Sequence, residues 1–162
     1  MSAHFPPKLK KDIRAAAARY PQKPAALLPV LHLVQKELGA ISPESERMVA
    51  ELLGLKPIRV REAVTFYSMF LRHPAGRFHV QVCTNLSCAI LGSPTLLALL
   101  QEELGLRPGE TTRDGMFSLS TVECLGACEE APCLFVNEER HGRLDREKLA
   151  ALLDDLKSNH AR

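Results

Sequence analysis

The first 70 residues carry apolar side chains at the spacing of amphipathic helices. Leucine and valine line one face of the segment 27–38, and Gly39 follows as a stop. Ser42 and Pro43 fit the N-cap and first turn of a second helix, which is also followed by a glycine. A third helical segment opens at Pro57. Three short helices with short connections predict a small bundle.

The apolar period changes from helical spacing to strict alternation near residue 77. Phe78, Val80 and Val82 alternate with polar residues, which is typical of a strand with one buried face. This strand runs directly into Cys83. The pattern then predicts a helix over 93–104, strands over 116–123, 133–137 and 140–143 with a turn at Glu138-Glu139, and a last helix capped by Asp145.

The predicted order in the second half, β-α-β-β-β-α, fits a small sandwich of thioredoxin-like type. We therefore predict an α+β chain with an N-terminal helical bundle over residues 1–72 and a thioredoxin-like domain over residues 73–162. The segment 71–76, which contains proline and glycine, is the expected joint.

Composition excludes several classes of partner. Hydrophobic residues make up 46% of the 162 positions, which is enough for a packed core. A net charge of +2 without a basic block, and 5% aromatic residues, argue against nucleic-acid binding. No apolar run approaches the roughly 20 residues of a membrane span, so we expect no direct membrane insertion. Because neither GxGxxG nor a P-loop occurs, we predict no nucleotide binding and no catalytic residue in this chain alone.

The N-terminus and the cysteine count indicate a reducing compartment. The lysine-rich start faintly resembles a transit peptide, but Asp12 interrupts it, and the segment fits a first helix better. Five cysteines are an odd number for a secreted disulfide framework, and no secretory signal precedes them. We expect a cytoplasmic protein, in which paired cysteines bind metal or carry out redox chemistry.

Four of the cysteines form two spaced pairs. Cys83 and Cys88 give C-x4-C, Cys124 and Cys128 give C-x3-C, and each pair begins where a predicted strand ends. Strands that are neighbours in one sheet can bring both loops to one edge. Four convergent thiolates supply the two ligands per iron of a [2Fe–2S] cluster. The short loops 84–87 and 125–127 can point backbone N–H groups at the sulfurs.

Spacing alone leaves other uses of these cysteines open. Zinc also takes four cysteines, so a zinc-stabilised structural module is an alternative, although the C-x2-C knuckles of zinc ribbons are missing. Structural thiols and a thiol–disulfide enzyme are further alternatives, and the absence of C-x-x-C counts against the enzyme. We interpret Cys133 as a small buried hydrophobe, with an auxiliary ligand or a reactive thiol as alternatives.

The motifs VCTNLSC (82–88) and VECLGACEEAPC (122–133) resemble the E-type subunit family of NADH–quinone oxidoreductase, the thioredoxin-like [2Fe–2S] subunit of respiratory complex I. The segments VTFYSMF (64–70) and ALLPVLHLVQKELG (26–39) also resemble that family, so that the likeness covers roughly residues 10–157. Cys133 departs from it, since an aliphatic residue is expected there.

The resemblance implies a thioredoxin-like [2Fe–2S] ferredoxin domain after the helical bundle. It implies that Cys83, Cys88, Cys124 and Cys128 ligate one [2Fe–2S] cluster. The implied partner is a flavoprotein subunit that binds FMN, NADH and a [4Fe–4S] cluster, with further subunits of the host complex. The chain would exchange single electrons with that FMN and would have no enzyme activity alone.

The host and the docking surface are less specific expectations. Relatives of the family also serve soluble NAD-linked hydrogenases and formate dehydrogenases, and the motifs do not separate these hosts from complex I. In the complex I case the chain would be peripheral at the inner face of the membrane. Candidates for a docking face or for the seam between the halves are Phe66, Tyr67, Met69 and Phe70.

Overall fold

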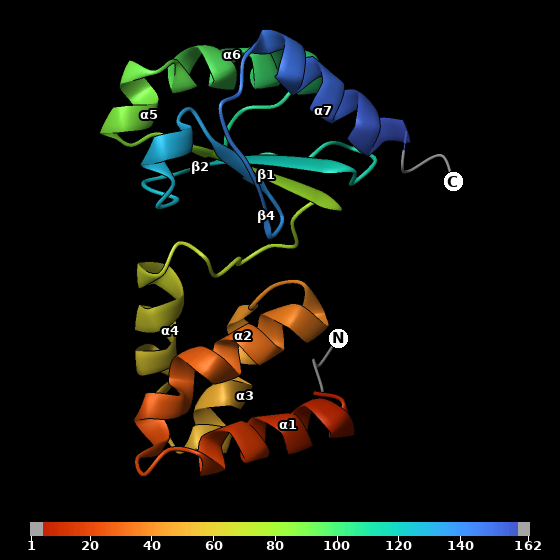
Figure 1. Cartoon of the computed structure of the whole chain (residues 1–162). Helices are drawn as coiled ribbons and strands as arrows, with labels where there is room; N and C mark the ends of the chain where they lie inside the picture. Colours follow the sequence, from red (N-terminus) through yellow and green to blue (C-terminus); the bar gives the residue numbers. More distant parts are fainter. Residues whose placement is uncertain (1–4, 159–162) are drawn as a thin grey trace. The chain divides into compact units, whose positions relative to one another are not determined.

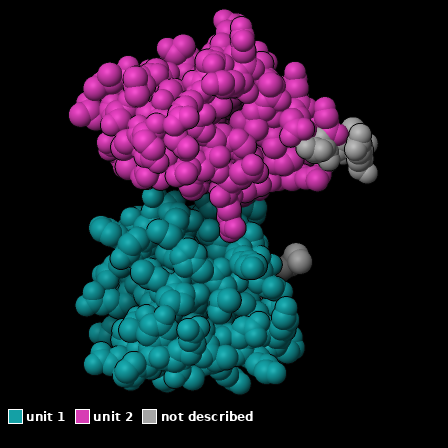
Figure 2. Space-filling model, viewed as in Figure 1, with its two compact units in different colours: residues 1–74 teal, residues 75–162 magenta. Residues whose placement is uncertain are grey.

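The protein consists of two compact units, which comprise residues 1–74 and 75–162 (Figure 2). The structure, a computed structural model, describes residues 5–158. Each unit has a hydrophobic core of its own. The predicted domain limits, 1–72 and 73–162, stay a prediction, because compactness in space does not by itself show independent folding.

The first unit is a helical bundle, as predicted. Its elements are α1 (Pro7–Ala18), the short 3₁₀ helix η1 (Lys23–Ala26), α2 (Leu27–Leu38), α3 (Pro43–Leu53) and α4 (Pro57–Phe66) (Figure 1). The apolar stripes of these helices face one another, and Leu31, Val49 and Val60 are fully buried between them. Their burial is what holds such short helices in place, since isolated helices of this length are marginal in water.

The ends of the helices follow the predicted capping residues. The Ser42 hydroxyl accepts a hydrogen bond from the backbone N–H of Ser45 at 3.1 Å, and Pro43 occupies the first turn of α3. Gly39 and Gly54 close α2 and α3 with φ of 77° and 64°. This left-handed conformation carries no steric penalty for glycine, which is why the stop signals were readable in the sequence.

The second unit is a four-stranded sheet covered by helices. Its strands are β1 (Phe78–Cys83), β2 (Phe117–Val122), β3 (Leu134–Val136) and β4 (Glu139–His141), in the order β2-β1-β3-β4. Its helices are α5 (Leu86–Ile90), α6 (Ser93–Leu104), the 3₁₀ helix η2 (Cys128–Glu130) and α7 (Arg146–Ser158). Figure 1 shows α6 and α7 on the same face of the sheet. The mixed helix and sheet architecture confirms the predicted fold class.

Strand β1 is the centre of this sheet. It pairs in parallel with β2, with Phe78 opposite Phe117, and antiparallel with β3, with Val82 opposite Leu134. A parallel pair needs a crossover connection, and α5 and α6 lie in that crossover. The inward residues Val80 and Val82 of β1 belong to the same core as the leucines of α6 and α7. The alternation in the sequence therefore matches the buried face.

Two local features differ from the sequence-based expectation. Helix α5 was missed, because five residues are too few to show a helical period. The last turn lies one residue earlier than predicted, at Asn137-Glu138, and β4 begins at Glu139. Asn137 has φ of 57°, and its side chain accepts from the backbone N–H of His79 at 2.9 Å. Asparagine tolerates this conformation better than glutamate, so it sets the register of the hairpin.

No helix within residues 5–158 is long and apolar enough to cross a membrane.

Replacing Ser42 tests the capping of α3. We expect Ser42→Ala to lower the free energy of unfolding by about 1 kcal/mol, because the backbone N–H of Ser45 loses its acceptor. Ser42→Asp keeps an acceptor at the same place and should stay within a few tenths of a kcal/mol of the unmodified protein. Urea denaturation followed by circular dichroism measures both. Equal destabilisation by the two variants would show that the hydroxyl does not act as a cap.

Candidate metal centre

The two cysteine loops leave the sheet at the same edge. Cys83, the last residue of β1, lies opposite Val122, the last residue of β2, and the two strands are parallel. Cys124 therefore follows only two residues beyond the point opposite Cys83. The backbone N–H of Thr84 donates to the carbonyl of Val122 at 2.9 Å, which keeps the loops together past the strand ends.

A third chain segment reaches this edge. Strand β3 runs antiparallel to β1, so its amino end meets the carboxyl end of β1. The backbone N–H of Cys83 donates to the carbonyl of Cys133 at 3.2 Å, directly before β3. The sequence analysis treated Cys133 mainly as core. Its place beside the first cysteine pair follows from strand direction, which the sequence pattern did not reveal.

Three sulfur atoms converge at this edge in the described part of the chain. The Sγ atoms of Cys83, Cys88 and Cys133 all lie within 4.8 Å of one another, and all three residues are buried. The Sγ atoms of Cys88 and Cys133 are 3.7 Å apart. Helix α5 positions Cys88, and Ala127 from the second loop packs against the group. Thiolate sulfur is the ligand type that iron–sulfur clusters and structural zinc require.

Cys124 and Cys128, the second predicted pair, are exposed and lie outside the close group of three. The Cys124 Sγ accepts from the backbone N–H of Gly126 at 3.3 Å, and Cys128 begins η2. Gly126 has φ of 68°, a conformation that suits glycine and turns the loop tightly behind Cys124. The role of Cys124 and Cys128 as ligands stays a prediction.

Backbone N–H groups surround the buried sulfurs. Burial raises the pKa of Cys83, but hydrogen bonds from the backbone N–H groups of Asn85 and Leu125 and from the two neighbouring thiols outweigh it, so that the pKa lies below its ordinary value. Asn85 comes from the first predicted loop and Leu125 from the second. The prediction that both loops would point N–H groups at sulfur is thus confirmed for Cys83, and this environment favours the thiolate that binds metal.

The other two buried thiols are held in the protonated form when no metal is present. Burial raises the pKa of Cys88, and the backbone N–H of Cys133 opposes this only in part. Burial also raises the pKa of Cys133, to about 12, and the neighbouring thiols add to the effect. Of the three, Cys83 therefore has the environment best suited to a negative charge.

The 3₁₀ helix that begins with Cys128 is fixed by contacts with the end of the β3–β4 hairpin. Glu130 forms an ion pair with Arg140 at 3.1 Å, and its carbonyl accepts from the backbone N–H of Arg143 at 2.6 Å. Gly142 lies so close that an added Cβ would come within 2.5 Å of the Glu130 Cβ. The hairpin thus sets where Cys128 is presented.

Apolar side chains are exposed on both units. On α5 and just after it, Leu86, Ile90 and Leu91 have exposed fractions of 71, 74 and 57%. In the first unit, Phe66 and Met69 are exposed at 78 and 50%. Among the predicted docking candidates, Tyr67 and Phe70 instead pack against the helical core.

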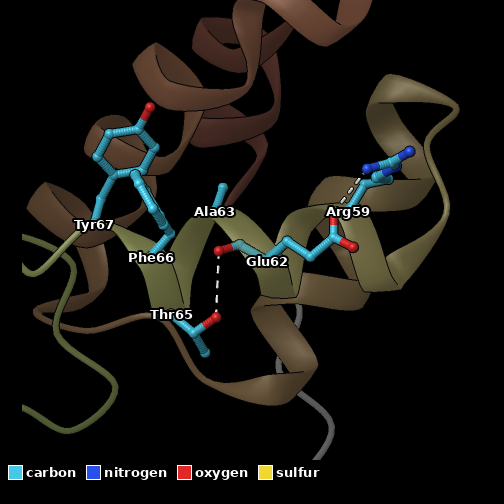
Figure 3. A pocket seen from close by; sticks show the side chains of 6 residues that line it. All are labelled: Arg59, Glu62, Ala63, Thr65, Phe66 and Tyr67. Carbon is cyan, nitrogen blue, oxygen red and sulfur yellow. Dashed lines mark hydrogen bonds and ion pairs between the residues drawn. The ribbon is translucent and has the colours of Figure 1, made fainter.

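The surface groove along α4 is separate from the cysteines. It has a volume of about 580 Å³ and lies entirely in the first unit (Figure 3). Figure 3 shows the ion pair between Arg59 and Glu62 and the hydrogen bond from the Thr65 hydroxyl to the Glu62 carbonyl in its lining. None of its lining residues is a cysteine or a histidine, so it offers no soft metal ligand.

Comparison with known proteins decides between the interpretations of this sheet edge. The family model of the thioredoxin-like [2Fe-2S] ferredoxin matches residues 13–157. The E-type subunit of NADH-quinone oxidoreductase of Rhizobium meliloti, the second of that type by its name, is 48% identical over 150 residues, which are 93% of this chain and 89% of that protein. The chain belongs to the thioredoxin-like [2Fe–2S] ferredoxin family, with the E-type subunits of NADH–quinone oxidoreductase.

Other relatives of this ferredoxin agree. NADH-quinone oxidoreductase subunit 2 of Thermus thermophilus is 43% identical over 144 residues, which are 87% of this chain and 80% of that protein. A chain in the crystal structure of NAD⁺-reducing [NiFe]-hydrogenase in the air-oxidized state has a TM-score of 0.70 at 22% identity. That likeness covers 82% of this chain but only 23% of the hydrogenase chain, and it shows a shared fold alone.

The family resemblance inferred from the cysteine motifs is therefore confirmed. The donor set fits the cofactor that gives the family its name: the buried sulfurs and the backbone N–H groups directed at Cys83 suit one [2Fe–2S] cluster. Clusters of this type are stabilised by N–H donors to sulfur, whereas such donors are not needed to explain a structural thiol.

Crowding at Gly142 provides a test of the hairpin's role in this ferredoxin. We expect Gly142→Ala to lower both the free energy of unfolding, by about 1–3 kcal/mol, and the iron retained per folded chain, because the new Cβ displaces Glu130 and with it Cys128. Iron and sulfide analysis of the purified folded protein measures the second effect.

Gly76→Ala is the matched control for Gly142→Ala. Its added Cβ would come within 2.6 Å of the Phe117 backbone, at the amino ends of β1 and β2, away from the sulfurs. It should destabilise the second unit similarly but leave the iron per folded chain unchanged. Equal loss of iron in both variants would mean that general instability, and not displacement of Cys128, releases the metal.

Proposed function

We propose that this ferredoxin is the [2Fe–2S] electron-transfer subunit of an NADH-oxidising complex of the NADH–quinone oxidoreductase type. In this proposal Cys83, Cys88, Cys124 and Cys128 hold the cluster, and the chain exchanges single electrons with the FMN of a partner flavoprotein subunit. The observation that carries it is the convergence of both cysteine loops on one sheet edge, with Leu125 of the second loop donating to Cys83 of the first.

The ligand assignment is supported by the geometry of the loops. Two parallel strands end in register, so C-x4-C and C-x3-C open at one level of the sheet. Cys124 and Cys128 are exposed, and they flank a loop whose Leu125 N–H is directed at a buried sulfur. Two ligands from each loop match the two irons of the cluster.

When bound, a [2Fe–2S] cluster accepts and returns one electron at a time. The residues of the chain supply the conditions for this. The thiolates hold the irons, and backbone N–H groups of Asn85, Leu125 and Gly126 donate to sulfur and offset its negative charge. Burial of Cys83 and Cys88 keeps water from one side of the site.

The partner is inferred from the relatives. The Rhizobium and Thermus proteins are named as subunits of NADH-quinone oxidoreductase, which supports a host complex with a flavoprotein subunit that binds NADH, FMN and a [4Fe–4S] cluster. In such a host the chain would lie on the cytoplasmic side, peripheral to the membrane. The fold shared with a chain of an NAD⁺-reducing hydrogenase supports the alternative that the host is a soluble NAD-linked hydrogenase or formate dehydrogenase.

Removing single cysteines tests the ligand set. We expect about two irons and two sulfides per chain after anaerobic purification, with a spin-half EPR signal that appears only on reduction with dithionite. Alanine at position 83, 88, 124 or 128 should abolish the signal, while Cys133→Ala should keep it. Stoichiometric zinc without colour or signal, unchanged by reconstitution with iron and sulfide, would instead support a structural zinc module.

Electron donors identify the host. A tagged chain isolated with its complex from its native cells should contain FMN, and NADH should produce the reduced [2Fe–2S] signal. Reduction by NADH, with neither hydrogen nor formate effective, supports the quinone-linked host. Reduction by hydrogen or by formate would assign the chain to the corresponding soluble enzyme. A complex without flavin would contradict the proposed partner.

A further inference from the structure

Cys133 is a cysteine that the proposed function does not use, and yet it lies among the ligands. Its side chain has no exposed surface, and its Sγ lies 3.7 Å from the Sγ of Cys88, within hydrogen-bonding distance for sulfur. It also belongs to the group of three sulfurs within 4.8 Å of one another. A cysteine that only filled core volume would not need to direct its sulfur at another sulfur.

The backbone holds Cys133 in this place from both sides. Its carbonyl accepts from the N–H of Cys83 at 3.2 Å, and its own N–H is directed at the sulfur of Cys88. The pairing of β3 with β1 begins at the next residue, Leu134. Because both ends of its peptide contact ligand residues, the side chain has little freedom to move away from the site.

We propose that Cys133 is a protonated, non-ligating thiol whose S–H group donates a hydrogen bond to the Sγ of Cys88 and thereby raises the reduction potential of the cluster. The inference rests on the ligand assignment of the proposed function. A cysteine that ligates iron is a thiolate and has no proton to donate, so in the pair Cys88–Cys133 only Cys133 can be the donor.

The direction of the effect follows from charge. Reduction of the cluster adds one electron, and the added negative charge is shared by the iron, the sulfides and the ligand sulfurs. A donor to a ligand sulfur stabilises the reduced form more than the oxidised form, and the effect is greater where water is excluded. Cys133 is therefore a positioning residue that acts on the cluster through Cys88.

Cys133→Ala and Cys133→Ser form the decisive pair of variants. Both remove the sulfur and leave a residue of nearly the same size, but serine keeps a donor and alanine does not. In Cys133→Ala we expect two irons per chain and a reduction equilibrium constant that is roughly tenfold lower, which is about 59 mV for a one-electron couple. Cys133→Ser should recover part of the difference. A redox titration monitored by EPR measures both.

A second readout detects the proton itself. In the reduced unmodified protein, proton ENDOR before and after exchange into D₂O should show an exchangeable proton coupled to the cluster that is absent from Cys133→Ala. Cys133→Val, which leaves no cavity, serves if the alanine variant folds poorly. Val136→Ala in the same strand is the packing control, because it removes buried volume without a donor and should leave the potential unchanged.

The outcomes separate this inference from the proposed function. An unchanged potential in Cys133→Ala, or an equal fall in the alanine, serine and Val136→Ala variants, would overturn the hydrogen-bond role while the cluster stays established. Loss of iron from Cys133→Ala, with iron retained on removal of Cys124 or Cys128, would make Cys133 a ligand and overturn the ligand assignment as well. Absence of iron from the unmodified protein would refute the proposed function itself.

Discussion

The pairing of β1 with a parallel strand on one side and an antiparallel strand on the other is the constraint on which the rest of the second unit depends. The parallel pair brings the ends of β1 and β2, with Cys83 and Val122 opposite each other, to one edge of the sheet. The antiparallel pair brings the start of β3 to the same edge, next to Cys133. A metal site of cysteines from three distant segments therefore needs no long loop.

The sulfur environment is uneven, and this unevenness has a physical cause. Cys83, at the end of a central strand, receives N–H groups from two loops, which favours the thiolate. Cys88 and Cys133 are equally buried but have fewer donors, so desolvation dominates and favours the thiol. A cluster at this edge would thus be held partly by a sulfur already suited to negative charge and partly by sulfurs that must lose protons when iron binds.

Helix α5 and the β3–β4 hairpin control the ligands from opposite sides. The helix buries Cys88 while exposing Leu86 and Ile90, so the same five residues carry a sulfur inward and an apolar surface outward. The hairpin holds η2, which begins with Cys128, through Glu130 and the close approach of Gly142. Such supporting contacts determine how accurately metal ligands are placed.

The sequence by itself determined the elements, the fold class and the cysteine pairs, because helix caps such as Ser42 and the alternation over β1 are local signals that neighbouring residues carry. The tertiary structure alone decided that Cys133 joins Cys83 and Cys88, since the direction of β3 depends on pairing across about 50 residues. It also decided the short helix α5 and the hairpin register at Asn137. Periodicity shows which face of an element is buried, whereas strand order and direction arise only when the elements pack.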